Sequence, residues 1–205
     1  RDRERSVHFR FEGKPEIGKE DVRLFELLHR AIRENRRVTL DYHPSNGKKE
    51  PRTLEPHFVF MRNGSWYLHA TKAGSTDRRT LKFARISNAR LGAGHFVPEL
   101  RDPKESFRYS FGIVSSDRKP RQPVVLEFEA SAAQRAAETL WHPEQKATPL
   151  RGGRLRLELP FAEATFLELE PWILSWGATV KVLAPAALKK TIAGKVRAMA
   201  DSCGV

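Results

Sequence analysis

Three aromatic side chains and three arginines have the residue types needed to bind nucleic acid. The rings offer flat faces on which bases stack, and the guanidinium groups offer donors for phosphate oxygens. These residues are Tyr42, Trp66, Tyr67, Arg52, Arg79 and Arg85. Because Arg79 and Arg85 lie an even number of positions apart, a strand without a bulge would point both to one face, and Lys82 to the other.

Each of these residues also has a purely structural interpretation. Trp66 and Leu68 alternate with Tyr67 and form the more apolar pair, so we expect Trp66 in the core, while Tyr67 fits either the core or the surface. Arg85 has a structural alternative as a buried arginine paired with Asp41 or Glu55.

The sequence contains no recognisable catalytic motif. There is no Gly-x-Ser-x-Gly elbow and no His-Glu-x-x-His, and we expect Gly92-Ala93-Gly94 to be a turn because no strand-to-helix context surrounds it. His57 and His69 can face each other across strands, but with no third ligand we expect packed or solvated histidines. We therefore expect no enzyme activity, no cofactor and no metal site.

Two remaining kinds of chemistry have little support. A nuclease would need acidic metal ligands, and Asp41, Glu50 and Glu55 are the only candidates among the first-half strands. The single cysteine, Cys203, excludes an intramolecular disulfide and a zinc site built from several cysteines, so we expect it to be inert.

The chain is strongly basic. Its 37 Lys and Arg against 25 Asp and Glu give a formal net charge of +12 over 205 residues, which attracts polyanions. Before Ser116 there are 24 basic and 15 acidic residues, and from Ser116 onward 13 and 10, so the first half carries +9 and the second +3. No apolar stretch is long enough to span a membrane and residues 1–10 are too charged for a secretory signal, so we expect a cytoplasmic protein.

The first half predicts a helix followed by a small β-barrel. Residues 1–19 are charged and predict an arm or linker, and apolar residues at helical spacing predict an amphipathic helix from Glu20 to Arg37. Alternating residues then predict strands over 38–43, 50–61, 66–71, 79–83 and 86–91, with bends near Pro51 and Pro56. Turns at Asn46-Gly47 and Asn63-Gly64 separate them. Because closure removes exposed edges, this pattern favours a small closed barrel.

The second half predicts a different architecture. Residues 92–110 contain prolines and few periodic apolar positions, and we place a connector over 98–122. Strands near 124–129, 146–150, 154–159 and 179–183, with helices over 131–140, 164–176 and 185–202, follow in the order βαββαβα, the ferredoxin-like arrangement. Trp172 and Trp176 share a helical face that we expect in the core. The predicted fold class is α+β.

Several motifs in order resemble the WYL domain of bacterial transcription regulators. They are Trp66-Tyr67-Leu68 after a turn, the Tyr42 strand, the strand with Arg52 and Pro56, and the run from Arg79 to Ile86. Residues 171–177 and 180–185 resemble the C-terminal extension of these regulators. The resemblance assigns 20–97 to a WYL domain with an Sm-like, SH3-type barrel, and 123–205 to the extension.

The resemblance implies an effector-sensing domain that binds single-stranded DNA or another anionic ligand. It links ligand sensing to Tyr67 and to Arg79 or Arg85, although Ala84 departs from the acidic residue of many relatives. The predicted binding residues are Tyr42, Arg52, His57, Tyr67, Arg79, Lys82 and Arg85. Because the chain starts with arginine, we expect a C-terminal fragment whose N-terminal helix-turn-helix domain, which binds promoter DNA, is absent. We also expect a homodimer formed through the C-terminal domain; the alternative function is a protein interaction module without a nucleic-acid ligand.

Overall fold

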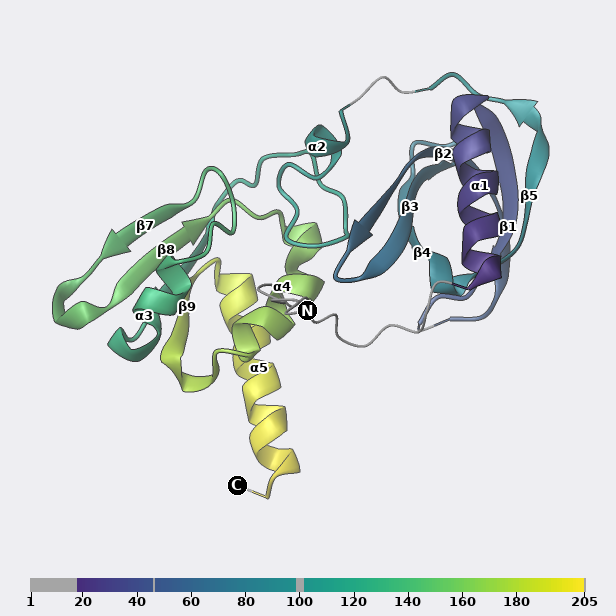
Figure 1. Cartoon of the computed structure of the whole chain (residues 1–205). Helices are drawn as coiled ribbons and strands as arrows, with labels where there is room; N and C mark the ends of the chain where they lie inside the picture. Colours follow the sequence, from purple (N-terminus) through teal and green to yellow (C-terminus); the bar gives the residue numbers. More distant parts are fainter. Residues whose placement is uncertain (1–17, 46, 99–101, 205) are drawn as a thin grey trace, which may run out of the picture. The chain divides into compact units, whose positions relative to one another are not determined.

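The computed structural model of the chain describes residues 18–45, 47–98 and 102–204. The chain divides into two compact units, Arg1–Arg101 and Asp102–Val205, each with its own antiparallel sheet (Figure 1). The predicted arm over residues 1–19 lies outside the described residues except for Gly18 and Lys19. Helices and strands are mixed in both units, so the α+β class is confirmed.

The first unit packs one helix against a five-stranded sheet. Helix α1 (Lys19–Arg33) precedes β1 (Arg36–Tyr42), β2 (Glu50–Arg62), β3 (Ser65–Lys72), β4 (Arg78–Lys82), the 3-10 helix η1 (Phe83–Arg85) and β5 (Ile86–His95). The strand order is β4-β3-β2-β1-β5 with every neighbouring pair antiparallel. The amphipathic pattern explains α1, because its apolar residues Leu28 and Ala31 are fully buried in the core of this sheet.

The core of the first unit follows the predicted alternation. Val38, Leu40 and Tyr42 of β1 are buried on one face, and Leu68 of β3 lies in the same core. Trp66 packs at the edge of this core, with its ring edge-on to Phe25 at 5.3 Å between centroids. The predicted core position of Trp66 is confirmed.

The predicted tight turn at Asn63-Gly64 is confirmed by its backbone. Asn63 has φ 46° and Gly64 has φ 67°, the two positive angles that this reversal between β2 and β3 requires. Pro56 lies in an internal strand and is followed by a β-bulge at His57, because the register with β3 shifts between Pro56 and Phe58. The bend predicted near Pro56 is therefore present.

Three predictions for this region need correction. Gly92-Ala93-Gly94 is not a turn but part of β5, which continues to His95. The glycines are explained by close approach to β1, because a Cβ on Gly92 would lie 3.0 Å from the carbonyl oxygen of Arg37. The connector predicted from Gly92 therefore starts too early. Closure into a barrel is also not confirmed, since β4 and β5 are the sheet edges and no ladder joins them within the described residues.

The second unit begins with a short helix and continues with a four-stranded sheet. Its elements are α2 (Pro103–Ser106), β6 (Val124–Phe128), α3 (Ala130–Ala137), β7 (Lys146–Pro149), the 3-10 helix η2 (Arg151–Gly153), β8 (Leu155–Leu159), the 3-10 helix η3 (Glu163–Thr165), α4 (Phe166–Leu174), the 3-10 helix η4 (Gly177–Thr179), β9 (Val180–Ala184) and α5 (Ala186–Ser202). The strand order is β7-β8-β6-β9, again with antiparallel neighbours.

Alternate residues of the central strands build the core of this unit. Leu126 and Phe128 of β6 and Leu157 of β8 are fully buried with Leu169 and Ile173 of α4. Trp176 follows α4, is 8% exposed, and contacts Phe128 edge-on at 5.0 Å between ring centroids. The predicted core position of this tryptophan is confirmed.

The loop that follows α2 is tied to α4 by one carboxylate. The backbone N–H groups of Ile113 and Val114 donate to the two carboxylate oxygens of Glu168 at 2.8 and 2.9 Å. Gly112 lies directly against this carboxylate, where a side chain would collide with it. The loop therefore depends on Glu168 and on the absence of a side chain at residue 112.

Candidate ligand-binding cavity

A cavity of about 320 Å³ opens in the first unit at the start of β2. It is lined by Glu50, Pro51, Arg52, Thr53, Leu54, Lys72, Ala73 and Arg79. Three cations and one carboxylate face this space, so it carries an excess of positive charge.

The strand register explains why three cations meet in this cavity. Arg52 lies two residues before buried Leu54, Lys72 two residues after buried Ala70, and Arg79 two residues before buried Leu81, so each shares the core face of its strand. Cross-strand pairing then sets Leu54 opposite Lys72, and Ala70 opposite Arg79. The cations continue the core face beyond the last apolar residues.

The two arginines of the cavity are held by neighbours in the chain. The Arg52 guanidinium lies 5.1 Å from the centroid of the Tyr42 ring and 3.4 Å from a carboxylate oxygen of Glu50. Nε of Arg79 donates to Asp77 Oδ2 at 3.0 Å. Both acidic partners are exposed, Glu50 with 63% of its side chain accessible and Asp77 with 40%, so these ion pairs are weak and open to competition by another anion.

Tyr67 and Lys82 lie away from the cavity. They pair across β3 and β4 on the face opposite Leu68 and Leu81. Tyr67 is 9% exposed and its ring stacks on Phe60 at 5.5 Å, so this tyrosine is a packed residue and not an exposed stacking platform. Of the surface and core alternatives for Tyr67, the structure favours the core.

His57 is held by a hydrogen bond at the bulge of β2. Its Nε2 lies 2.7 Å from Oγ1 of Thr71, and its ring is 6.1 Å from that of His69, which is buried. Within the described residues, no group of three or more His, Cys, Asp or Glu side chains is placed to hold a metal ion.

Arg85 does not share a face with Arg79 through strand alternation. The 3-10 helix η1 interrupts the strand at Phe83, and the even spacing of the two arginines loses its meaning there. The alternative of a buried ion pair is wrong for both partners named: Asp41 bonds Asn88 and Lys49, and Glu55 bonds Arg37. The Asn88 amide and then the Lys49 ammonium hold the pKa of Asp41 below its usual value.

The sequence did not reveal Lys72 as a member of the site. Its signal was present in the alternation Leu68, Ala70, Lys72, which sets it on the core face at the end of β3. Tyr42, Arg52 and Arg79 are brought together around the cavity, whereas His57, Tyr67, Lys82 and Arg85 do not line it.

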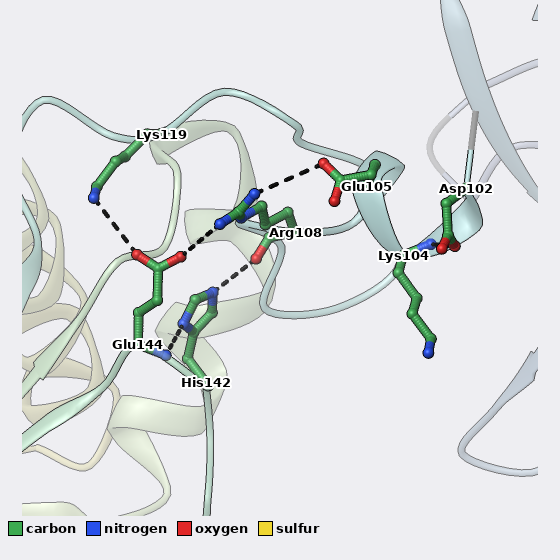
Figure 2. Close-up of polar contacts among 7 residues, drawn as sticks. All are labelled: Asp102, Lys104, Glu105, Arg108, Lys119, His142 and Glu144. Carbon is green, nitrogen blue, oxygen red and sulfur yellow. Dashed lines mark hydrogen bonds and ion pairs between the residues drawn. The ribbon is translucent and has the colours of Figure 1, made fainter. Parts of the chain in front are cut away.

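A second polar cluster lies in the second unit, around the buried imidazole of His142 (Figure 2). Its Nδ1 accepts from the backbone N–H of Glu144 at 2.9 Å, and its Nε2 lies 2.7 Å from the carbonyl oxygen of Arg108. Since a backbone N–H only donates and a carbonyl only accepts, the neutral tautomer with hydrogen on Nε2 is required. The Arg108 guanidinium and the Lys119 ammonium hold the pKa of Glu144 below its usual value.

Replacing His142 with alanine is expected to lower the free energy of unfolding by about 2 kcal/mol, because a buried carbonyl and a buried N–H lose their partners. His142→Gln should cost distinctly less, because an amide can both donate and accept at this position. Urea denaturation followed by circular dichroism measures both. Equal losses for the two variants would show that the hydrogen bonds of the ring contribute little.

The comparisons with known proteins agree with this architecture. Residues 23–91 match the WYL domain family, and residues 120–200 match the WCX domain family. The chain is therefore a WYL-domain protein whose WYL domain is followed by a WCX domain. The resemblance predicted from the Trp66-Tyr67-Leu68 motif is confirmed. No curated protein matches the chain.

Two solved structures are similar to the chain. One is proteasome accessory factor B/C (PafBC) of Arthrobacter aurescens, with 18% identity and a TM-score of 0.38, over 89% of this chain and 27% of that one. The other is a CRISPR Cas-related protein, with 11% identity and a TM-score of 0.54, over 90% of this chain and 52% of that one. The second likeness shows a shared fold. The chain thus spans about a quarter and about half of the lengths of these two proteins. No helix among the described residues is long and apolar enough to cross a membrane.

Proposed function

We propose that this chain is the effector-sensing part of a transcription regulator, and that the cavity with Arg52, Lys72 and Arg79 binds the phosphates of single-stranded DNA or of another anionic ligand. The observation that carries the proposal is the convergence of these three cations on one cavity of about 320 Å³. Two arginines and a lysine offer both forked and point-charge donors, a combination suited to phosphate oxygens.

The burial of the tyrosines shapes the kind of recognition we propose. Tyr42 and Tyr67 are only 8% and 9% exposed, so neither presents an open face to a base. Tyr42 instead stacks under the Arg52 guanidinium and orients it. Recognition then rests on phosphates more than on bases, and binding should depend strongly on salt and weakly on base sequence.

The finer parts of the proposal concern the complete regulator. The first unit is proposed to be an Sm-like sheet and the second a ferredoxin-like unit through which two chains pair. Ligand binding would control a separate domain that binds promoter DNA in the cytoplasm, without any catalysed reaction. The WYL and WCX matches support this proposal at the level of domain class.

Fluorescence polarisation with a short labelled single-stranded oligonucleotide tests the proposal. Binding should weaken steeply as salt rises, with a slope in the logarithmic plot of about −0.7 for each phosphate contacted. A folded chain that leaves the oligonucleotide free at low salt would refute single-stranded DNA as the ligand.

Replacing Glu50 with glutamine is expected to strengthen binding by about three- to tenfold, because this exposed carboxylate occupies the Arg52 guanidinium that a phosphate would take. The change also raises the net positive charge of the chain by one. Glu26→Gln, on the exposed surface of α1, is the matched control for that charge. If both variants gain equally, long-range charge and not competition at Arg52 explains the effect.

A further inference from the structure

A second cavity, of about 510 Å³, lies in the WCX unit between β9, the end of α4 and one face of α5. Its walls are mainly apolar and include Val182, Leu183, Ile192 and Val196. Leu183 and Val196 are 39% and 50% exposed, which is high for large apolar side chains lining a hollow. We call this feature the β9–α5 groove.

One wall of the groove is an unpaired strand. β9 bonds only to β6 and forms an edge of the sheet, so the other side of its backbone has no ladder partner among the described residues. Such an edge accepts an extended chain through main-chain hydrogen bonds, and neighbouring apolar pockets then take alternate side chains. The groove and the edge therefore favour an extended occupant.

The charged residues of the groove are all cations. Lys181, Lys189 and Arg197 line it, and none of its described lining residues is acidic. Lys181 is engaged by Glu129 at 2.7 Å, which leaves Lys189 and Arg197 for an occupant. These two lie eight residues apart on α5, about 12 Å, with Ile192 and Val196 between them. An occupant with an apolar centre and acidic flanks would match this spacing.

The charge also decides between kinds of occupant. A second copy of the chain, paired edge to edge by a twofold axis, would bring two sets of these cations together with no anion between them. Nucleic acid would match the cations but would leave the apolar walls exposed to water. We propose that the β9–α5 groove binds an acidic, extended segment of a partner protein, which adds a strand to the free edge of β9.

A labelled synthetic peptide of alternating valine and glutamate residues tests this proposal, with a valine and lysine peptide of equal length as reference. The full chain should bind the acidic peptide and not the basic one, and the unpaired amides of β9 should exchange their hydrogens more slowly in the complex. No binding of the acidic peptide, or binding without slower exchange in β9, would overturn the proposal.

Charge reversal on α5 locates the binding. Lys189→Glu is expected to weaken the acidic peptide at least tenfold, whereas Lys190→Glu, the exposed neighbour outside the groove, should change affinity no more than about twofold. Equal losses would show that only the overall charge of the helix matters and would contradict the groove. Thermal melts confirm that both variants are folded. Oligonucleotide binding by the WYL cavity should be unchanged in both, which separates this proposal from the proposed function.

Discussion

Replacing Arg52 and Arg79 together with alanine is expected to weaken the binding of single-stranded DNA by about 100-fold, because two charge-assisted hydrogen bonds to phosphate are lost. The slope of affinity against salt should fall by about 1.4, or about 0.7 for each contact. Stability should change little, since the acidic partners of both arginines are exposed. Polarisation titrations at several salt concentrations, run beside thermal melts, measure all three quantities.

The control for this experiment removes the same charge elsewhere. Arg33→Ala lies on the exposed side of α1 and does not line the cavity. Combined with the other exposed α1 cation outside the cavity, Arg23 or Lys19, it matches the loss of two charges. If that control pair weakens binding as strongly as the cavity pair, the interaction is a general attraction to a basic chain and the cavity is not the site.

Replacing Gly112 with alanine is expected to lower the free energy of unfolding of the second unit by about 2 to 3 kcal/mol. The new Cβ would take the place of the Glu168 carboxylate, which accepts the N–H groups of Ile113 and Val114. The side chain of Glu168 can turn away, but both charge-assisted hydrogen bonds are then lost. Urea denaturation of the full chain, followed by tryptophan fluorescence, measures the change, because all tryptophans except Trp66 lie in this unit.

A double-mutant cycle shows whether the carboxylate carries this effect. In a Glu168→Ala background the space beside residue 112 is empty, so adding Gly112→Ala should cost only a few tenths of a kcal/mol. Full additivity of the two substitutions would contradict the account. Backbone strain at Gly112 would then be the better explanation.

The sequence predicted the elements well because the local signals were strong. Alternation over Val38, Leu40 and Tyr42 identified β1, and the Asn63-Gly64 pair identified its turn. The order of strands and helices in the second half was recovered because turn residues and a clear change of period separate them. These signals lie within a few residues of one another in the chain.

The site was only partly predictable, because it depends on register between distant strands. Arg52 and Arg79 were identified by residue type, but their meeting with Lys72 follows from pairings of Leu54 with Lys72 and of Ala70 with Arg79. Arg85 was paired with Arg79 because the sequence gives no sign of the 3-10 helix that separates them. The bulge at His57 and the extension of β5 through Gly92 are likewise set by tertiary approach, as the contact of Gly92 with Arg37 shows.

A crystal structure of the chain with a short single-stranded oligonucleotide is the most direct test of the central claim. The account predicts phosphate oxygens within hydrogen-bond distance of Arg52 and Arg79, with the ion pair between Arg52 and Glu50 broken and the bases turned away from the buried rings of Tyr42 and Tyr67. An oligonucleotide bound on another surface, with Arg52 still paired to Glu50 and Arg79 to Asp77, would contradict it.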